Sequence, residues 1–342
     1  DPRVAAKAAL VDGLAVVRYH QEAALQGEVE PLHQMRVAAR RLRAAVELFA
    51  TTLHGSRVMA YRRDLRWVGQ VAGAVRECDM TAALIKERSS LLDQAMAAAL
   101  EPVYERLGNM REAACIRLAA MVKTRRYQIL GERLAHPLIR LRGPGVTVGE
   151  CAPKMIGPLA AKVKKAGKRI TMESPPEVFH TLRKRLKRLR YGLEMLAAAG
   201  SKHHGKAIAR LEEMQELLGQ HHDAVEVAGW LRAQAGQAEA LPPATLMAAG
   251  AMIQELGRHQ EKLAAQTLKQ WKQVVHAGAI SEALKEIQNE ADRRRHDRRK
   301  AEAAGRAAKG MEPAPAAESG DGAQSAEAVP RSDHSAGSQD AA

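Results

Sequence analysis

A basic stretch that occurs twice limits what this chain can fold into. The residues from His33 to Phe49 recur from His180 to Leu196, displaced by 147 residues, the difference between 180 and 33. A repeat at such a long separation indicates a duplicated architecture. No gap is needed to match the polar positions of the two copies: His33 with His180, Arg36 with Arg183, Arg40 with Lys187, Arg41 with Arg188, Arg43 with Arg190, and Glu47 with Glu194.

Each copy carries two stripes when it is placed on an α-helix. At about 100° per residue, the charged positions 33, 36, 40, 43 and 47 fall within a sector of about 80°. A second, apolar stripe lies roughly 110° around the helix, and it consists of Met35, Ala39, Leu42, Val46 and Phe49 in the first copy and Leu182, Leu186, Leu189, Leu193 and Leu196 in the second. The apolar stripe predicts a core face. The charged stripe must border solvent or an anion, because burial of unpaired charge is costly.

The charged stripe has two interpretations, a solvated face or an anion-binding face. A solvated face tolerates any polar residue, whereas both copies keep histidine and cations at the same angles, which favours anion binding. Arginine offers a fixed fork of donors, lysine a mobile point charge, and histidine gains charge as the pH falls. Such a helix presents cations over about 15 Å. This length suits an extended anion, and two facing helices would form a channel.

Composition narrows the class of protein and of partner. The chain has 342 residues, 46% hydrophobic and 3% aromatic, so its core must be built from Ala, Leu, Val and Met, which suits helices. A net charge of +14 favours polyanions: nucleic acid, an anionic membrane surface or inorganic phosphate polymers. No apolar run approaches the ~18 residues of a membrane span. The scattered Cys78, Cys115 and Cys151 predict free thiols in a reducing cytoplasm.

Helical periodicity covers most of the chain, and no strand-like alternation of any length is present. Besides the two basic helices, we expect helices over residues 3–27, 57–74, 79–87, 91–123, 127–134, 158–168, 206–218, 225–237, 243–276 and 280–304. Proline and glycine in residues 136–153 predict a hinge between a first half of about 1–140 and a second half of about 154–304. The tail 305–342 has three cations against six carboxylates and few large apolar residues, so we expect it to be acidic and disordered.

A second repeated motif follows each basic helix. It consists of Gly73, Arg76 and Glu77 in the first half and of Gly219, His222 and Asp223 in the second. We interpret both motifs as turns between helices. Either the cationic or titratable residue extends the basic lining while the acid orients a neighbouring cation, or the glycine ends one helix and the acid caps the next.

Two alternative functions have some support in the sequence. His221, His222 and Asp223, with His203-His204 as a complement, invite a metal-dependent phosphohydrolase hypothesis, but no further ligand pair falls at recognisable spacing. The run Arg293–Lys300 suggests a nucleic-acid contact, although few aromatic residues are present to stack on bases. No phosphate-binding glycine loop and no Ser or Cys nucleophile signature appears.

The two signatures together resemble the CHAD family, the conserved histidine α-helical domain. The resemblance lies in His33-x-x-Arg36-x-x-x-Arg40-Arg41-x-Arg43 with Arg76-Glu77-x-Asp79, and in His180-x-x-Arg183-x-x-x-Lys187-Arg188-x-Arg190-Tyr191 with Gly219-x-x-His222-Asp223. It covers residues 3 to 304, with Glu77 where the family commonly has Asp. It implies two four-helix bundles about a pseudo-twofold axis, and a basic surface or pore that binds inorganic polyphosphate. Such domains often follow a triphosphate-tunnel (CYTH) domain, which would lie upstream of Asp1, and some relatives associate with polyhydroxyalkanoate granules.

We therefore predict an all-α, internally duplicated module over residues 1–304 that binds polyphosphate without catalysis or cofactor. We expect it in the cytoplasm, including polyphosphate granules. The alternatives are a nucleic-acid-binding protein and, less favoured, a metal-dependent phosphohydrolase. The predicted polyphosphate-binding residues are His33, Arg36, Arg40, Arg41, Arg43, Arg76, His180, Arg183, Lys184, Lys187, Arg188, Arg190, Tyr191 and His222.

Overall fold

The computed structural model describes residues 1–139, 146–199, 204–237, 241–276 and 278–309. These ranges form helices and no named strand, with one isolated antiparallel bridge between Leu53 and Ile139, so the predicted all-α class is confirmed. The helices are α1 (Pro2–Leu25), α2 (Val29–Leu48), α3 (Gly55–Ser89), α4 (Gln94–Ala98), α5 (Glu101–Lys123), α6 (Arg125–Ala135), α7 (Val148–Gly167), α8 (Pro176–Ala198), α9 (Gly205–Ala235), α10 (Pro243–His276) and α11 (Ala279–Lys309).

The chain divides into two compact units, residues 1–297 and 298–342. In the second unit, the described residues 298–309 are helical, so the last helix extends beyond the predicted end near residue 304. The remainder of the predicted disordered tail lies outside the described residues. No helix in the described ranges is long and apolar enough to cross a membrane.

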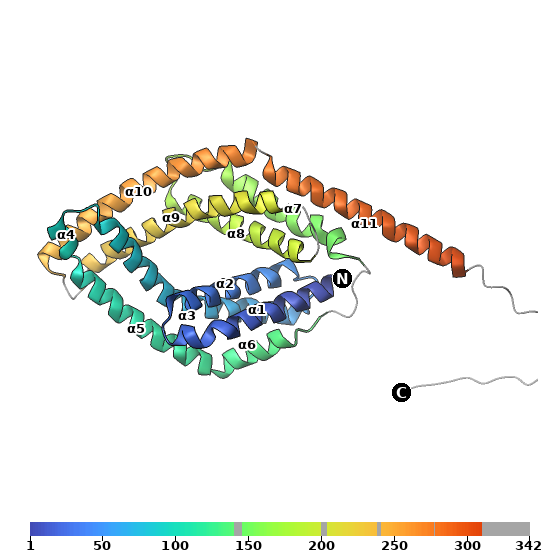
Figure 1. Cartoon of the computed structure of the whole chain (residues 1–342), viewed down its shortest axis with the longest axis horizontal. Helices are drawn as coiled ribbons and strands as arrows, with labels where there is room; N and C mark the ends of the chain where they lie inside the picture. Colours follow the sequence, from blue (N-terminus) through green and yellow to red (C-terminus); the bar gives the residue numbers. More distant parts are fainter. Residues whose placement is uncertain (140–145, 200–203, 238–240, 277, 310–342) are drawn as a thin grey trace, which may run out of the picture. The chain divides into compact units, whose positions relative to one another are not determined.

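Three apolar clusters form the core of the first unit. The first joins α1, α2, α3, α5 and α6, and the second joins α7, α8, α9, α10 and α11. A third cluster packs α3, α4 and α5 against α9 and α10, helices that are distant in the sequence. Every residue of the two predicted apolar stripes is buried in the first or the second cluster, which confirms the core face of each basic helix. In Figure 1, α2 and α3 face α8 and α9.

Two pairs of helices, α2 with α8 and α3 with α9, match one another at nearly the same separation in the sequence. The starts of α2 and α8, at Val29 and Pro176, are 147 residues apart, as the basic stretches are. In α3 and α9 the correspondence shifts to 146 residues, as for Leu65 and Leu211. At that separation each buried position of α3 corresponds to a buried position of α9 in eight cases: 61 with 207, 65 with 211, 68 with 214, 72 with 218, 75 with 221, 78 with 224, 81 with 227, and 85 with 231.

The two predicted turns are wrong, because both lie inside continuous helices. Gly73 is in the middle of α3, and Gly219 is in the middle of α9. A glycine inside a helix costs only about 1 kcal/mol relative to alanine, and tertiary packing on both sides outweighs this. Glu77 and Asp223 are therefore not helix caps.

The break predicted before the second half is shorter than expected. Thr147 and Glu150 form a capping box that starts α7 at Val148, and Pro153 and Pro158 lie within that helix. The second basic helix, α8, has Pro175 as its N-cap and Pro176 as its first residue, where the missing amide hydrogen costs little.

Candidate anion-binding site

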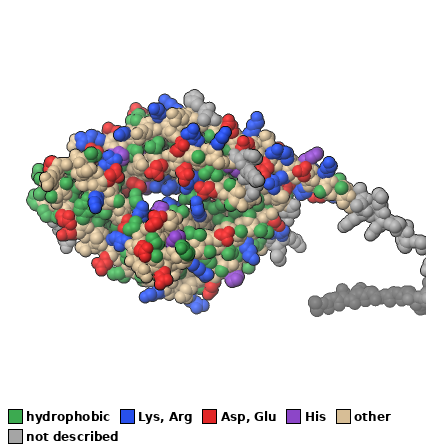
Figure 2. Space-filling view, in the orientation of Figure 1, with side chains coloured by type: hydrophobic (Ala, Val, Ile, Leu, Met, Phe, Trp, Pro, Cys, Tyr) green, Lys and Arg blue, Asp and Glu red, His purple; other side chains and the backbone are tan. Residues whose placement is uncertain are grey.

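A cavity of about 590 Å³ lies among α2, α3, α8, α9 and α10 in the first unit. Figure 2 shows a hollow near the middle of this unit, with Lys, Arg and His side chains around it. The charged and histidine residues that line the cavity are His33, Arg36, Arg40, Arg76, Glu87, Arg88, Arg183, Lys187, Arg190, Glu212, Glu216, Asp223 and His259. Seven of these are Arg or Lys and four are carboxylates, so cations dominate the lining.

The structure brings eight of the predicted binding residues to this cavity. They are His33, Arg36 and Arg40 from α2, Arg76 from α3, and Arg183, Lys187, Arg190 and Tyr191 from α8. They come from both copies of the basic stretch, because α2 and α8 contact each other. The two stripes thus form one site from two distant parts of the sequence.

The cations in the cavity are half-buried and lie close to one another. Burial and the neighbouring Arg40 lower the pKa of Arg36 to about 10, against the opposing effect of Glu77. Burial, Arg183 and Arg40 lower the pKa of Lys187 to about 7. Burial also lowers the pKa of Arg183, although Asp223 acts in the opposite direction. Positive charge at these positions is therefore destabilised by its surroundings, and an anion in the cavity would relieve that cost.

Several hydrogen-bond donors at the cavity lack a partner. The Nε atoms of Arg40, Arg88 and Arg183 are buried without a hydrogen bond. Arg190 differs, because its Nε lies 3.4 Å from Glu194 Oε1 in an ion pair and its Nη1 donates to Glu212 Oε1 at 2.7 Å. An unpartnered buried donor costs about 1–3 kcal/mol, so a ligand rich in acceptor oxygens is the chemistry that this cavity favours.

The predicted His180 and His222 lie together beside the cavity. Their ring centroids are 4.3 Å apart. Burial, and then the charge of Lys184, lowers the pKa of His180. Burial, and then the charge of Arg183, lowers the pKa of His222 to about 3. Burial and Arg76 lower the pKa of His33 in the same way. All three imidazoles are therefore neutral donors or acceptors at neutral pH.

The predicted Arg41, Arg43, Lys184 and Arg188 are not among the residues that line the cavity. Arg41 Nη2 lies 3.4 Å from Glu194 Oε2, and Arg188 Nε lies 3.5 Å from Glu47 Oε2.

These two pairs are reciprocal between α2 and α8. Arg41 corresponds to Arg188 in the repeat, and Glu47 corresponds to Glu194, so the same Arg–Glu contact is made once in each direction. Burial lowers the pKa of Arg43, which also has Glu47 nearby. Lys184 is near His180.

Asp223 is the carboxylate among the cations. It lines the cavity from α9, and Arg183 and Lys187 both favour its charged form. Burial nevertheless raises the pKa of Asp223 overall. Asp223 thus acts on Arg183 and Lys187 through its charge, whereas Glu212 forms a direct ion pair with Arg190, with Glu212 Oε1 2.7 Å from Arg190 Nη1.

Arg88 and His259 belong to the cavity but were missed by the sequence motifs. Arg88 Nη2 lies 2.8 Å from His259 Nε2, and Arg88 Nη1 lies 3.7 Å from Glu255 Oε1. His259 is on α10, far from either repeat, so no spacing indicates it. Arg88 lies on the same continuous helix as Arg76, and the turn predicted after Gly73 concealed this relation.

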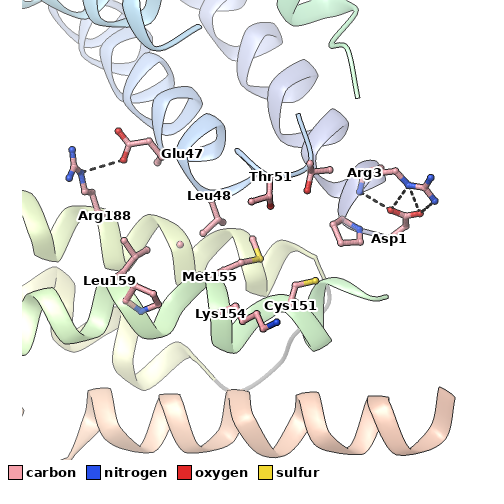
Figure 3. A pocket seen from close by; sticks show the side chains of 15 residues that line it. Asp1, Arg3, Glu47, Leu48, Thr51, Cys151, Lys154, Met155, Leu159 and Arg188 are labelled. Carbon is pink, nitrogen blue, oxygen red and sulfur yellow. Dashed lines mark hydrogen bonds and ion pairs between the residues drawn. The ribbon is translucent and has the colours of Figure 1, made fainter. Parts of the chain in front are cut away.

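A second cavity of about 620 Å³ lies where α1, α2, α7 and α8 meet. Figure 3 shows Leu48, Met155 and Leu159 pointing into it, and the Glu47–Arg188 pair at its edge. Its lining is mainly apolar, so this cavity is not the candidate anion site.

The alternative functions gain no support from the arrangement of the described residues. These contain no group of three or more His, Cys, Asp or Glu side chains that could hold a metal ion. His221, half of the predicted metal doublet, is buried and stacks on Phe179 at 4.6 Å. Within the basic run of α11, Arg294 and Arg295 pair with Glu290 and Asp292 of the same helix.

The described residues define an all-helical protein in which helices distant in the sequence line one cavity with more cations than carboxylates. The model of the CHAD domain matches residues 8–232, and the chain belongs to this family, for which polyphosphate binding is the known property.

Two solved structures share the fold. PptA from Streptomyces chartreusis is 19% identical with a TM-score of 0.64, and the match covers 79% of this chain and 99% of that one. The CHAD domain from the plant Ricinus communis is 24% identical with a TM-score of 0.63, covering 78% and 91%. No curated protein matches the chain.

Proposed function

We propose that this chain binds inorganic polyphosphate, without cleaving it, in the basic cavity among α2, α3, α8 and α9. One observation carries the proposal: half-buried cations from both copies of the repeat line a single cavity, and the Nε atoms of Arg40 and Arg183 there lack a hydrogen bond. Phosphoryl oxygens are charged acceptors with no hydrogens to donate at neutral pH, so they match a lining dominated by donors.

The cavity also suits a chain of phosphates better than a single phosphate. At 1.5 Å per residue, His33 to Arg40 on α2 and Arg183 to Arg190 on α8 each extend over about 10 Å. Cations at intervals of one helical turn can contact successive units of a linear polymer. A single orthophosphate would engage one end of each row and leave the other donors unpartnered.

The lining favours inorganic polyphosphate over nucleic acid. Tyr191 is the one Phe, Trp or Tyr among the described residues that line the cavity, and it is buried. Base recognition in single strands relies on exposed aromatic faces. The ion pairs within α11 further reduce the positive charge that the Arg293–Lys300 run offers to a duplex.

The reciprocal ion pairs support the proposed pseudo-twofold arrangement of the two halves. Arg41 with Glu194 and Arg188 with Glu47 repeat one contact in both directions, as expected across a twofold axis. Such an axis would place the row of cations on α2 and the row of cations on α8 in equivalent positions on either side of one polymer.

A competition titration at physiological salt tests the proposed function. Long-chain polyphosphate would be titrated against duplex DNA and single-stranded RNA while free phosphate is monitored. We expect polyphosphate binding that neither nucleic acid displaces, and no phosphate release. Equal competition by all three polymers would show a general polyanion binder, and phosphate release would show an enzyme.

A further inference from the structure

A buried amide on α9 stands apart from the charged residues of the cavity. Gln215 is 7% exposed and lines the cavity, and its Nε2 is buried without a hydrogen bond. Gln220 lines the same cavity from the same helix, but its Nε2 donates to Glu216 Oε1 at 3.0 Å. The two glutamines therefore differ in one respect that matters for binding: Gln215 has a donor without an acceptor.

Packing alone does not explain an amide at position 215. Its neighbours on the buried face of α9 include Leu211, Met214 and Leu218, so an apolar side chain of the same size would suit the surroundings and avoid the unpaired donor. At the separation of 146 residues, the matching position on α3 is Gly69, where an added Cβ would meet nothing within 4 Å. The first half thus has no side chain at the matching position.

We propose that Gln215 is a binding residue whose amide donates a hydrogen bond to a phosphoryl oxygen of the polymer in the cavity. This inference rests on the proposed function. A half-turn of the terminal amide exchanges its nitrogen and oxygen, and the turn breaks no hydrogen bond of Nε2 because that atom has none. The amide can thus present its NH₂ group to an oxygen that enters the cavity.

The charges around Gln215 explain why a neutral donor is needed on this wall. Glu212, Glu216 and Asp223 line the cavity from the same helix and repel phosphate. The cations on α8 draw the polymer toward α9, while the carboxylates oppose its approach. An amide donor lets one phosphoryl oxygen contact α9 without adding positive charge. Gln215 thereby fixes the position of the chain between the two walls.

The test compares Gln215→Met with Gln270→Met in the full chain, because Gln270 Nε2 donates to Glu213 Oε2 at 2.8 Å and Gln270 does not line the cavity. Loss of a neutral bond to a charged oxygen should weaken polyphosphate affinity about tenfold in Gln215→Met. The slope of log K against log salt should not change, because no charge is removed. The melting temperature without polyphosphate should stay level or rise, since the unpaired donor is gone. Gln270→Met should bind within about twofold of the wild type.

A second variant guards against an uninformative packing change. Gln215→Glu keeps the shape but replaces the donor with an acceptor, and it should bind more weakly than Gln215→Met. Wild-type affinity in both Gln215 variants would overturn the inference while leaving the proposed function intact. A fall in melting temperature that accompanies the affinity loss in both variants would assign Gln215 a structural role and also overturn it. A wild-type protein that does not bind polyphosphate would overturn the function itself.

Discussion

Arg36, Arg183 and Lys187 occupy surroundings that disfavour their charged forms. Burial is the largest cause for each, and Arg40 adds repulsion to all three. A chain selected for stability alone would place apolar or paired residues at these positions. Residues that destabilise a fold locally are concentrated at functional sites, so we attribute these cations to ligand binding.

Lys187 should couple polyphosphate binding to pH. Its lowered pKa of about 7, against an ordinary value of 10.5, means that the unfolded chain binds more protons than the free folded protein between these values. Stability of the free protein should therefore rise with pH in that window. A bound polyanion favours the ammonium form, so affinity should rise as the pH falls from about 9 to 7.

The matched control for this prediction is Lys187→Arg, because Arg40 occupies the corresponding position in the first copy. An arginine stays charged over this range, so the variant should lose most of the pH dependence. Dissociation constants measured at fixed ionic strength from pH 9 to 7 would decide the matter. Equal constants for the wild type across that range would exclude Lys187 from the site.

The lowered pKa values of His33 and His180 place any histidine contribution below about pH 6.5.

A pair of double substitutions should separate the two faces of the basic helices. Arg36→Gln with Arg183→Gln removes two half-buried cations of the cavity, and we expect a loss of affinity of about 100-fold or more. Arg41→Gln with Arg188→Gln removes the same formal charge from the reciprocal ion pairs, and exposed pairs contribute little. This second variant should bind within about threefold of the wild type. Equal losses in titration calorimetry would mean that net charge, rather than the cavity, determines binding.

Helical periodicity places Arg41 and Arg188 outside the charged stripe, whereas the repeat predicts them as binding residues together with Arg40. Arg40 and Arg41 are adjacent in the sequence and repeat together at positions 187 and 188, so the repeat marks both as important. Their separate environments depend on the crossing of α2 and α8, which pairs Arg41 with Glu194 and leaves Arg40 at the cavity. A sequence repeat indicates that a position matters and cannot say whether the cause is a ligand or an interface.

At the level of helices, the spacing of apolar residues predicted the buried faces correctly, whereas glycine residues predicted turns that the structure does not have. The stripe from Met35 to Phe49 is buried throughout, because helix geometry alone fixes which side chains share a face. Gly73 and Gly219 suggested turns, yet each lies inside a helix. Glycine permits a turn without requiring one, and the buried residues on both sides of Gly73 decide the outcome.

Gly73→Ala should stabilise the protein. Gly73 is helical, and an added Cβ would meet nothing within 4 Å, so the substitution removes backbone freedom from the unfolded chain at no steric cost. We expect the free energy of unfolding to rise by about 0.5–1 kcal/mol, as measured by urea denaturation.

Gly27→Ala is the matched opposite case. Gly27 has a φ of +87°, a conformation that alanine adopts only at a cost of roughly 1 kcal/mol or more. This variant should be less stable than the wild type. A destabilised Gly73→Ala would indicate that the chain does turn at that position.

At the level of the whole molecule, the cavity depends on contacts that no local pattern reveals. The third core cluster packs the ends of α3 and α9 against α5 and α10, and it brings His259 to Arg88. The repeat could predict which two helices carry the rows of cations, namely α2 and α8. It could not predict the residues that α10 adds, since α10 has no signature of its own and its position follows from packing across the two halves.

The salt dependence of binding measures how much of the cavity the polymer uses. Seven Arg and Lys side chains line the cavity. For a single-stranded polyanion, each phosphate neutralised contributes about −0.7 to the slope of log K against log salt. Full engagement therefore predicts a slope of about −5 for long-chain polyphosphate. Arg36→Gln with Arg183→Gln should reduce its magnitude by about 1.4, whereas removal of Arg41 and Arg188 should leave it unchanged. Because both double variants have the same net charge, a general attraction between a basic protein and an anion would change the two slopes equally, and only a polymer held inside the cavity would separate them.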